Sequence, residues 1–199
     1  MLASIHPLGE RGRGQRYSVT ATSYVVGAAA GGAVMGVTFG WLGSVALALV
    51  GPSDTVIALL VVAAAGLVLL LERRAGSTRL PSWHRQVNED WMTSYRGWVY
   101  GAGFGFQLGL GFVTIITSGG VYLTFVLAFL SGSWQWGLLI GLVFGLARAS
   151  VALSVARVRN PAQLRAAHRR LQALAAPAQR IALGTQAAVA VAGLVVVLT

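Results

Sequence analysis

Residues 97–131 read GWVYGAGFGFQLGLGFVTIITSGGVYLTFVLAFLS and contain no charged residue. A continuous helix of this length would be about 50 Å long, whereas the hydrocarbon core of a bilayer is about 30 Å thick. The segment must therefore either tilt strongly or break. We expect a break at 117–120, because paired glycines lower helix propensity and the two hydroxyls can bond backbone groups that the break leaves unpaired.

Four glycines before this break recur at every fourth position: Gly97, Gly101, Gly105 and Gly109. On a helix they form a face without side chains, against which another helix can pack very closely. The first apolar run, at 21–50, is also long and rich in glycine, and we expect it to break at 39–44. The first, third and fourth spans are expected to form a tightly packed core.

The composition is that of a membrane protein. Of the 199 residues, 56% are hydrophobic and 10% are charged, whereas about a quarter of the residues of a soluble domain are charged. The absence of cysteine excludes disulfides, thiolate metal sites and thiol chemistry. The first 18 residues lack an apolar core followed by a small-residue cleavage site, so we expect no cleavable signal peptide.

The fifteen arginines set the expected topology. Fourteen lie in three polar segments, Arg148 lies within an apolar run, and the connections near residues 52 and 132 hold none. Because basic segments stay on the cytoplasmic side, this distribution fits an all-α bundle of five spans with a cytoplasmic amino terminus. The expected segments are a basic tail at 1–20, then a single transmembrane domain at 21–199 with spans at 21–50, 55–71, 97–131, 134–156 and 181–198 and cytoplasmic loops at 72–96 and 157–180.

Some local signals refine this layout. A complete hairpin within 97–131 would place the six arginines of 157–180 outside, so we reject it, while a broken or a partly re-entrant helix both remain open. Ser53 or Asp54 is the expected cap of the second span. Asn160 followed by Pro161 predicts the start of a basic amphipathic helix.

Arg148 is the candidate functional residue, because a charge inside the hydrocarbon costs a few kcal/mol unless it finds a partner or water. No acid is expected within a span, so its partners would be Gln107 or hydroxyls. One hypothesis is a pocket for an anionic solute beside the broken helix; the alternative is an arginine that reaches toward the membrane surface and bonds exposed carbonyls. The candidate substrate-binding residues are Arg148, Gln107, Thr114, Thr117 and Ser118.

Other functional classes find little support in the sequence. His6, His84 and His168 have no spacing that resembles a metal motif. There is no nucleotide fingerprint, and no nucleophile and base pair that suggests hydrolysis. We therefore expect no cofactor, no metal and no enzymatic activity. The net charge of +10 lies between apolar runs, which argues against nucleic acid as a partner.

The layout of two glycine-rich spans, each followed by a short turn and a second span, resembles the membrane domain of the CcdA/DsbD thiol-disulfide relay proteins, a branch of the LysE-type transporter group. The resemblance covers about residues 21–156, and the stretch GLVFGLAR at 141–148 is similar to a glycine-arginine stretch of that family. It implies a transporter-like helical bundle. The family's relay cysteines are absent here, where Gly43–Ser44 and Ser118–Gly119 take the comparable places, and the family usually has six spans.

These observations together predict a multi-pass protein of the bacterial cytoplasmic membrane that binds or transports a small solute, an anion being one candidate. The alternative is a non-catalytic structural or accessory subunit, whose glycine faces dock a partner membrane protein. Membrane lipids are expected partners, and a homo-oligomer is a further candidate. Clustered arginines at 161–175 also raise a lipid-binding role, although every cytoplasmic loop of a membrane protein is expected to be basic.

Overall fold

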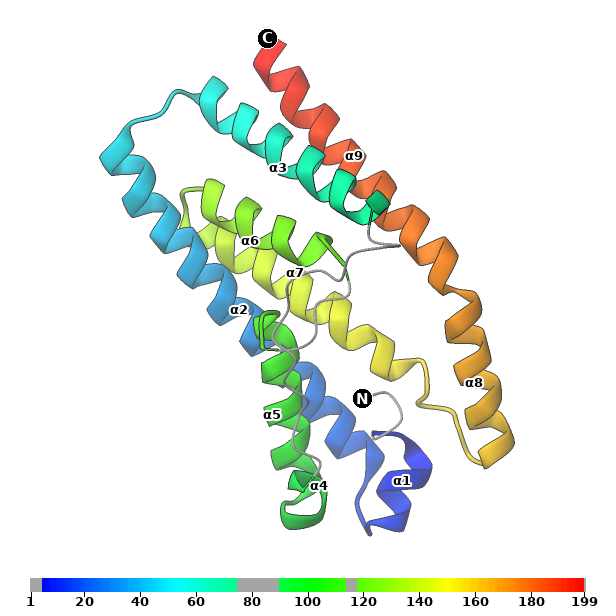
Figure 1. Ribbon diagram of the computed structural model, residues 1–199. Coiled ribbons are helices and arrows are strands. Elements are labelled where there is room, and N and C mark those ends of the chain that lie inside the picture. The colour runs from blue at the N-terminus through cyan, green and yellow to red at the C-terminus, as the bar shows by residue number, and fades with distance from the viewer. Residues whose placement is uncertain (1–4, 75–89, 114–117, 199) are drawn as a thin grey trace.

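A computed structural model of the chain describes residues 5–74, 90–113 and 118–198 (Figure 1). The regular elements in these ranges are all helices. Four stretches are long and apolar enough to cross a membrane, namely α2, α3, α7 and the α8–α9 pair, which indicates a multi-pass membrane protein. The helices are α1 (Pro7–Gly12), α2 (Tyr17–Val50), α3 (Asp54–Arg74), α4 (Trp91–Ser94), α5 (Gly97–Leu110), α6 (Gly120–Leu130), α7 (Trp134–Leu153), α8 (Pro161–Ala173) and α9 (Ala175–Leu198).

Several helix ends follow the local signals in the sequence. α2 ends at Val50, and its C-cap is Gly51, whose φ of 60° suits glycine. The Ser53 hydroxyl accepts a hydrogen bond from the Val56 amide at 3.4 Å, so Ser53 caps α3. The Asn160 side chain caps α8, which begins at Pro161 as predicted.

The centre of the fold is a core in which α2 packs on both α5 and α7, and these two helices also contact each other. A Cβ built at Gly105 of α5 would overlap the carbonyl oxygen of Tyr24, and one built at Gly109 would overlap that of Ala28. The predicted glycine face of the third span is therefore used, because only glycine permits backbones to approach this closely. On the face toward α7, Gly36 of α2 and Gly137 of α7 meet backbone to backbone. The predicted core of the first, third and fourth spans is confirmed.

The same contacts fix the directions of these helices. Gly27 lies against Ala102 and Gly31 against Phe106, so α5 runs parallel to α2. α7 runs antiparallel to α2, since Gly32 lies against Gly141 while the later Gly40 lies against the earlier Ser133.

The predicted break of the first span at 39–44 is wrong. α2 is continuous over 34 residues, from Tyr17 to Val50. Its glycines lower helix propensity, but Gly40 packs against α7 and Gly43 packs against Phe129 of α6. Close packing along the whole helix offsets the low propensity.

The predicted break of the third span is confirmed, but it begins earlier than 117–120. α5 ends at Leu110, and Gly111 takes a φ of 82°, which ends the helix. α6 starts at Gly120 and also runs parallel to α2, because Phe125 stacks on Phe39 and Phe129 lies against Gly43. The segment therefore continues in one direction past the break, as a broken helix does and a re-entrant hairpin does not.

α3 and α9 form an antiparallel pair beside this core (Figure 1). Gly193 of α9 lies against Val62 near the middle of α3, whereas Gln186 contacts Glu72 near the end of α3. α9 begins at Ala175, before the predicted start at 181, and α3 continues beyond the predicted end at residue 71. Glu72 is thereby drawn into a helix that packs in the bundle.

Candidate functional site

The break between α5 and α6 begins in an aromatic environment. A Cβ at Gly111 would lie 3.0 Å from the Phe125 ring and 3.1 Å from the Phe144 ring. The ring of Phe125 contacts those of Phe112 and Phe144, with centroids 6.4 Å apart in each case. These rings lie against α5 where it ends, so the start of the break is held by apolar contacts.

The end of the break carries a buried carboxylate. Glu72 on α3 is 9% exposed, and its Oε1 accepts hydrogen bonds from the Ser118 hydroxyl and the Gly119 amide, each at 2.6 Å. The Ser118 hydroxyl in turn accepts a hydrogen bond from the Gly120 amide at 3.2 Å. A carboxylate at the start of a helix is favoured by the free N–H groups and by the helix dipole. Glu72 and Ser118 therefore cap the start of α6 together.

α9 contributes a further member of this cluster. The Gln186 amide nitrogen donates to Oε2 of Glu72 at 2.9 Å, and Gln186 is 2% exposed. The Gln186 carbonyl oxygen has no hydrogen-bond donor among the described residues. A buried acceptor without a donor costs about 1–3 kcal/mol, so this oxygen suits a water molecule or a ligand that donates a hydrogen bond.

Arg148 lies on α7, four residues after Phe144. Its guanidinium carbon is 5.3 Å from the centroid of the Phe144 ring, which is the same ring that approaches Gly111. Tyr24 of α2 is close enough to Arg148 for an electrostatic interaction. The beginning of the break thus has a cation nearby, and its end has a carboxylate.

The predicted site residues fall into three groups. Ser118 is part of the carboxylate cluster, and Arg148 reaches the break through Phe144. Gln107 is half-buried on α5, four residues before Gly111. Thr114 and Thr117 lie outside the described residues.

Sequence reasoning missed Glu72 and Gln186. Glu72 precedes two arginines and therefore looks like part of a cytoplasmic loop, although the structure buries it. Gln186 is the only strongly polar side chain between Arg180 and Leu198 apart from Thr185. A lone amide in an apolar span was the one signal available for this partner.

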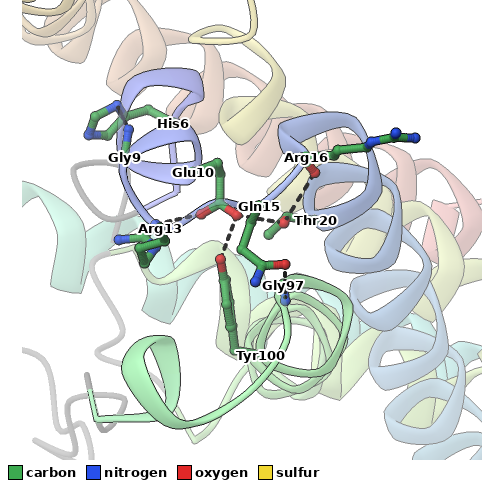
Figure 2. Close-up of polar contacts among 9 residues, drawn as sticks. All are labelled: His6, Gly9, Glu10, Arg13, Gln15, Arg16, Thr20, Gly97 and Tyr100. Carbon is green, nitrogen blue, oxygen red and sulfur yellow. Dashed lines mark hydrogen bonds and ion pairs between the residues drawn. The ribbon is translucent and has the colours of Figure 1, made fainter.

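A second polar cluster lies at the amino-terminal end of the bundle (Figure 2). Glu10 of α1 is fully buried, forms an ion pair with Arg13, and accepts hydrogen bonds from Thr20 at 2.7 Å and from Tyr100 at 2.5 Å. The Gln15 side chain accepts a hydrogen bond from the first amide of α5. This cluster, which we call the Glu10 clamp, fixes α1 to α2 and α5. It shows that part of the predicted basic tail at 1–20 is packed on the bundle.

Comparisons with protein families, with curated proteins and with solved structures found no match for this chain. The resemblance to the CcdA/DsbD type therefore stays a prediction from the residues that suggest it. The residues at the start and at the end of the break are therefore the basis for a proposed function.

Proposed function

We propose that this protein binds a small polar solute at the break between α5 and α6 and carries it across the membrane. The observation that carries the proposal is the buried Glu72–Gln186 pair at the end of the break, in which the Gln186 carbonyl oxygen has no hydrogen-bond donor among the described residues. Ionisable groups within a membrane bundle are costly and usually functional. Broken helices supply free backbone groups for solute binding in many transporters.

Charges on the two sides of the break suggest the class of solute. The Glu72 carboxylate and the Gln186 carbonyl oxygen suit a group that donates hydrogen bonds, such as an ammonium or a hydroxyl. Arg148 suits an anionic group. Since Glu72 already accepts a hydrogen bond from the Gly119 amide directly before α6, a simple anion would compete with it there. A solute with an anionic group and a donor group fits this arrangement better than a simple anion.

The proposal includes the five-span topology with a cytoplasmic amino terminus. It is supported by the parallel course of α2, α5 and α6, which is expected if the first and third spans cross in the same direction. The broken third span adds one crossing to the four long apolar stretches. The same bundle would suit a distant relative of the LysE-type group that has lost or never had relay chemistry.

The test is a flux measurement on purified protein in proteoliposomes. Uptake into the proteoliposomes is measured with radiolabelled zwitterionic amino acids, short dicarboxylates and primary amines in turn. We expect a response to the zwitterions that is lost in Arg148→Ala and in Glu72→Gln. Arg157→Ala and Asp54→Asn are the matched controls, because they remove the same charges in the connection after α7 and at the start of α3 and should keep the response.

Equal flux in the wild type and in both site variants would remove these residues from transport. The accessory-subunit alternative would then gain weight, particularly if a stoichiometric companion co-purified from native membranes. The glycine faces that motivated this alternative are occupied by helices of the same chain, with Gly36 against Gly137 and Gly105 against Tyr24. They are therefore not free to dock a partner in this structure.

A further inference from the structure

A basic cavity lies where α2 begins and α7 ends. Its volume is about 340 Å³, and it opens between α1, the start of α2 and the connection from α7 to α8. The lining residues are Pro7, Arg11, Gln15, Arg16, Tyr17, Ala156, Val158 and Arg159. Three of these eight residues are arginines, and none is acidic.

The three arginines come from separate parts of the chain. Arg11 lies on α1, Arg16 directly precedes α2, and Arg159 lies in the connection to α8. Among the described residues, no carboxylate forms an ion pair with any of them. The nearest acid in sequence, Glu10, is buried in the Glu10 clamp and is bound to Arg13 (Figure 2). The cavity therefore keeps a net positive charge.

The walls of the cavity are held in place by packing and hydrogen bonds. The Glu10 clamp fixes α1 on one side, and Val155 and Val158 are buried on the other side. The Tyr17 hydroxyl donates a hydrogen bond to the Ala152 carbonyl at 3.1 Å, which ties the start of α2 to the end of α7. Arginines on a fixed frame lose less entropy on binding an anion than arginines on a free tail.

We propose that this cavity binds the phosphate group of an anionic phospholipid. Arginine suits phosphate because its planar guanidinium donates two parallel hydrogen bonds. The cavity lies at one end of two helices long enough to cross the membrane, which is where a lipid headgroup would meet the protein. Basic pockets between helices at the cytoplasmic surface bind anionic headgroups in other membrane proteins. Free inorganic phosphate has the same chemistry and is the second source that the test distinguishes.

The test is a lipid titration by native mass spectrometry on the full chain in neutral detergent. Phosphatidylglycerol is compared with phosphatidylcholine for the wild type and two triple variants. The cavity variant is Arg11→Gln/Arg16→Gln/Arg159→Gln, and the control is Arg73→Gln/Arg96→Gln/Arg180→Gln, which loses the same charge at exposed positions outside the cavity. Circular dichroism and the thermal unfolding midpoint establish that each variant is folded.

We expect the cavity variant to lose about tenfold or more of its affinity for phosphatidylglycerol, since charge-assisted hydrogen bonds are lost. The control variant should keep its affinity within about twofold, as expected for exposed charges. An equal loss in both variants, or no preference for phosphatidylglycerol over phosphatidylcholine, would overturn the proposal. If millimolar inorganic phosphate displaced the lipid from the wild type, free phosphate would replace the lipid as the ligand.

Discussion

Gly36 shows how a single residue type determines the packing of this bundle. A Cβ at this position would overlap the carbonyl oxygen of Gly137. We therefore expect Gly36→Ala to lower the free energy of unfolding by about 1–3 kcal/mol or more, because both backbones would have to move apart. The measurement is the thermal unfolding midpoint in detergent, with tryptophan fluorescence as the signal.

Gly184 on α9 is the matched control for this substitution, because a Cβ built there meets nothing within 4 Å. Gly184→Ala should keep or raise stability, by up to about 1 kcal/mol, since alanine is the better helix former. Equal midpoints for Gly36→Ala and the wild type would contradict the close packing of α2 on α7.

His6 makes the stability of the amino-terminal segment depend on pH. Its ring nitrogen accepts a hydrogen bond from the Gly9 amide at 3.1 Å and so caps α1. Burial lowers the pKa of His6 below the usual 6.5, and the charge of Arg13 lowers it further. Glu10 opposes these effects and His168 adds to them. The unfolded state therefore binds a proton at His6 more readily than the folded state does. The contribution of His6 to stability is fully present above pH 6.5 and falls as the pH drops toward the lowered pKa.

We therefore expect the unfolding midpoint of the wild type to fall between about pH 7.5 and about pH 5 by more than that of His6→Asn. Asparagine can also cap a helix but does not titrate in this range. Identical pH profiles for the two proteins would show that His6 does not contribute to the pH dependence of stability.

Single residues also mark the limit of what sequence could predict about the site. Arg148 and Ser118 stand out as a charge and a hydroxyl within apolar runs; Ser118 lies at the break, and Arg148 contacts the Phe144 ring that approaches Gly111. Glu72 does not stand out, because an acid beside Arg73 and Arg74 has the composition of a loop. Its burial depends on where α6 and α9 pack, which local sequence does not encode.

Among the elements, the contact between α3 and the start of α6 is the most specific. Glu72 joins α3 to α6 through Gly119 and to α9 through Gln186. We expect Glu72→Ala to lower the free energy of unfolding by about 2 kcal/mol or more, because hydrogen bonds to a charged group are lost. A double-mutant cycle with Gln186→Leu should give a coupling energy of about 1–3 kcal/mol.

The control cycle combines Glu72→Ala with Asp54→Asn. Asp54 begins α3, about 27 Å from Glu72 along the helix axis, so the two changes should be additive. A coupling energy of zero between Glu72 and Gln186 would contradict the arrangement of α3, α6 and α9.

The two glycine-rich spans show why element boundaries were only partly predictable. Both contain segments of low helix propensity, yet α2 is continuous and the segment of α5 and α6 is broken. Gly40 and Gly43 of α2 have close neighbours on α7 and α6, whereas Gly111 takes a positive φ against aromatic rings. Propensity indicates where a helix can break, and tertiary packing decides whether it does.

For the whole molecule, the five-span topology can be tested with single cysteines, because the chain contains none. Ser53→Cys and Ser131→Cys lie at the arginine-free turns, and Arg165→Cys lies on α8. In intact cells, a membrane-impermeant maleimide should label the first two and should label Arg165→Cys only after permeabilisation. Labelling of Arg165→Cys in intact cells would reverse the orientation.

The overall architecture was predictable because the strongest signals in this chain extend over whole helices and loops. Apolar runs define the membrane helices, arginines define their expected orientation, and glycine spacing defines the faces that meet. The Glu10 clamp was not predictable, because nothing local indicates that Glu10 is buried against Tyr100. Such pairings depend on the packed bundle as a whole.

The most direct test of the proposed solute site is the access of water to the break in the third span. Ser118→Cys in native membranes is treated with a small charged methanethiosulfonate, with Ser53→Cys and the fully buried Ala65→Cys as references. We predict that Ser118→Cys reacts, more slowly than Ser53→Cys and much faster than Ala65→Cys. A Ser118→Cys that is as unreactive as Ala65→Cys would contradict a solute site at the break.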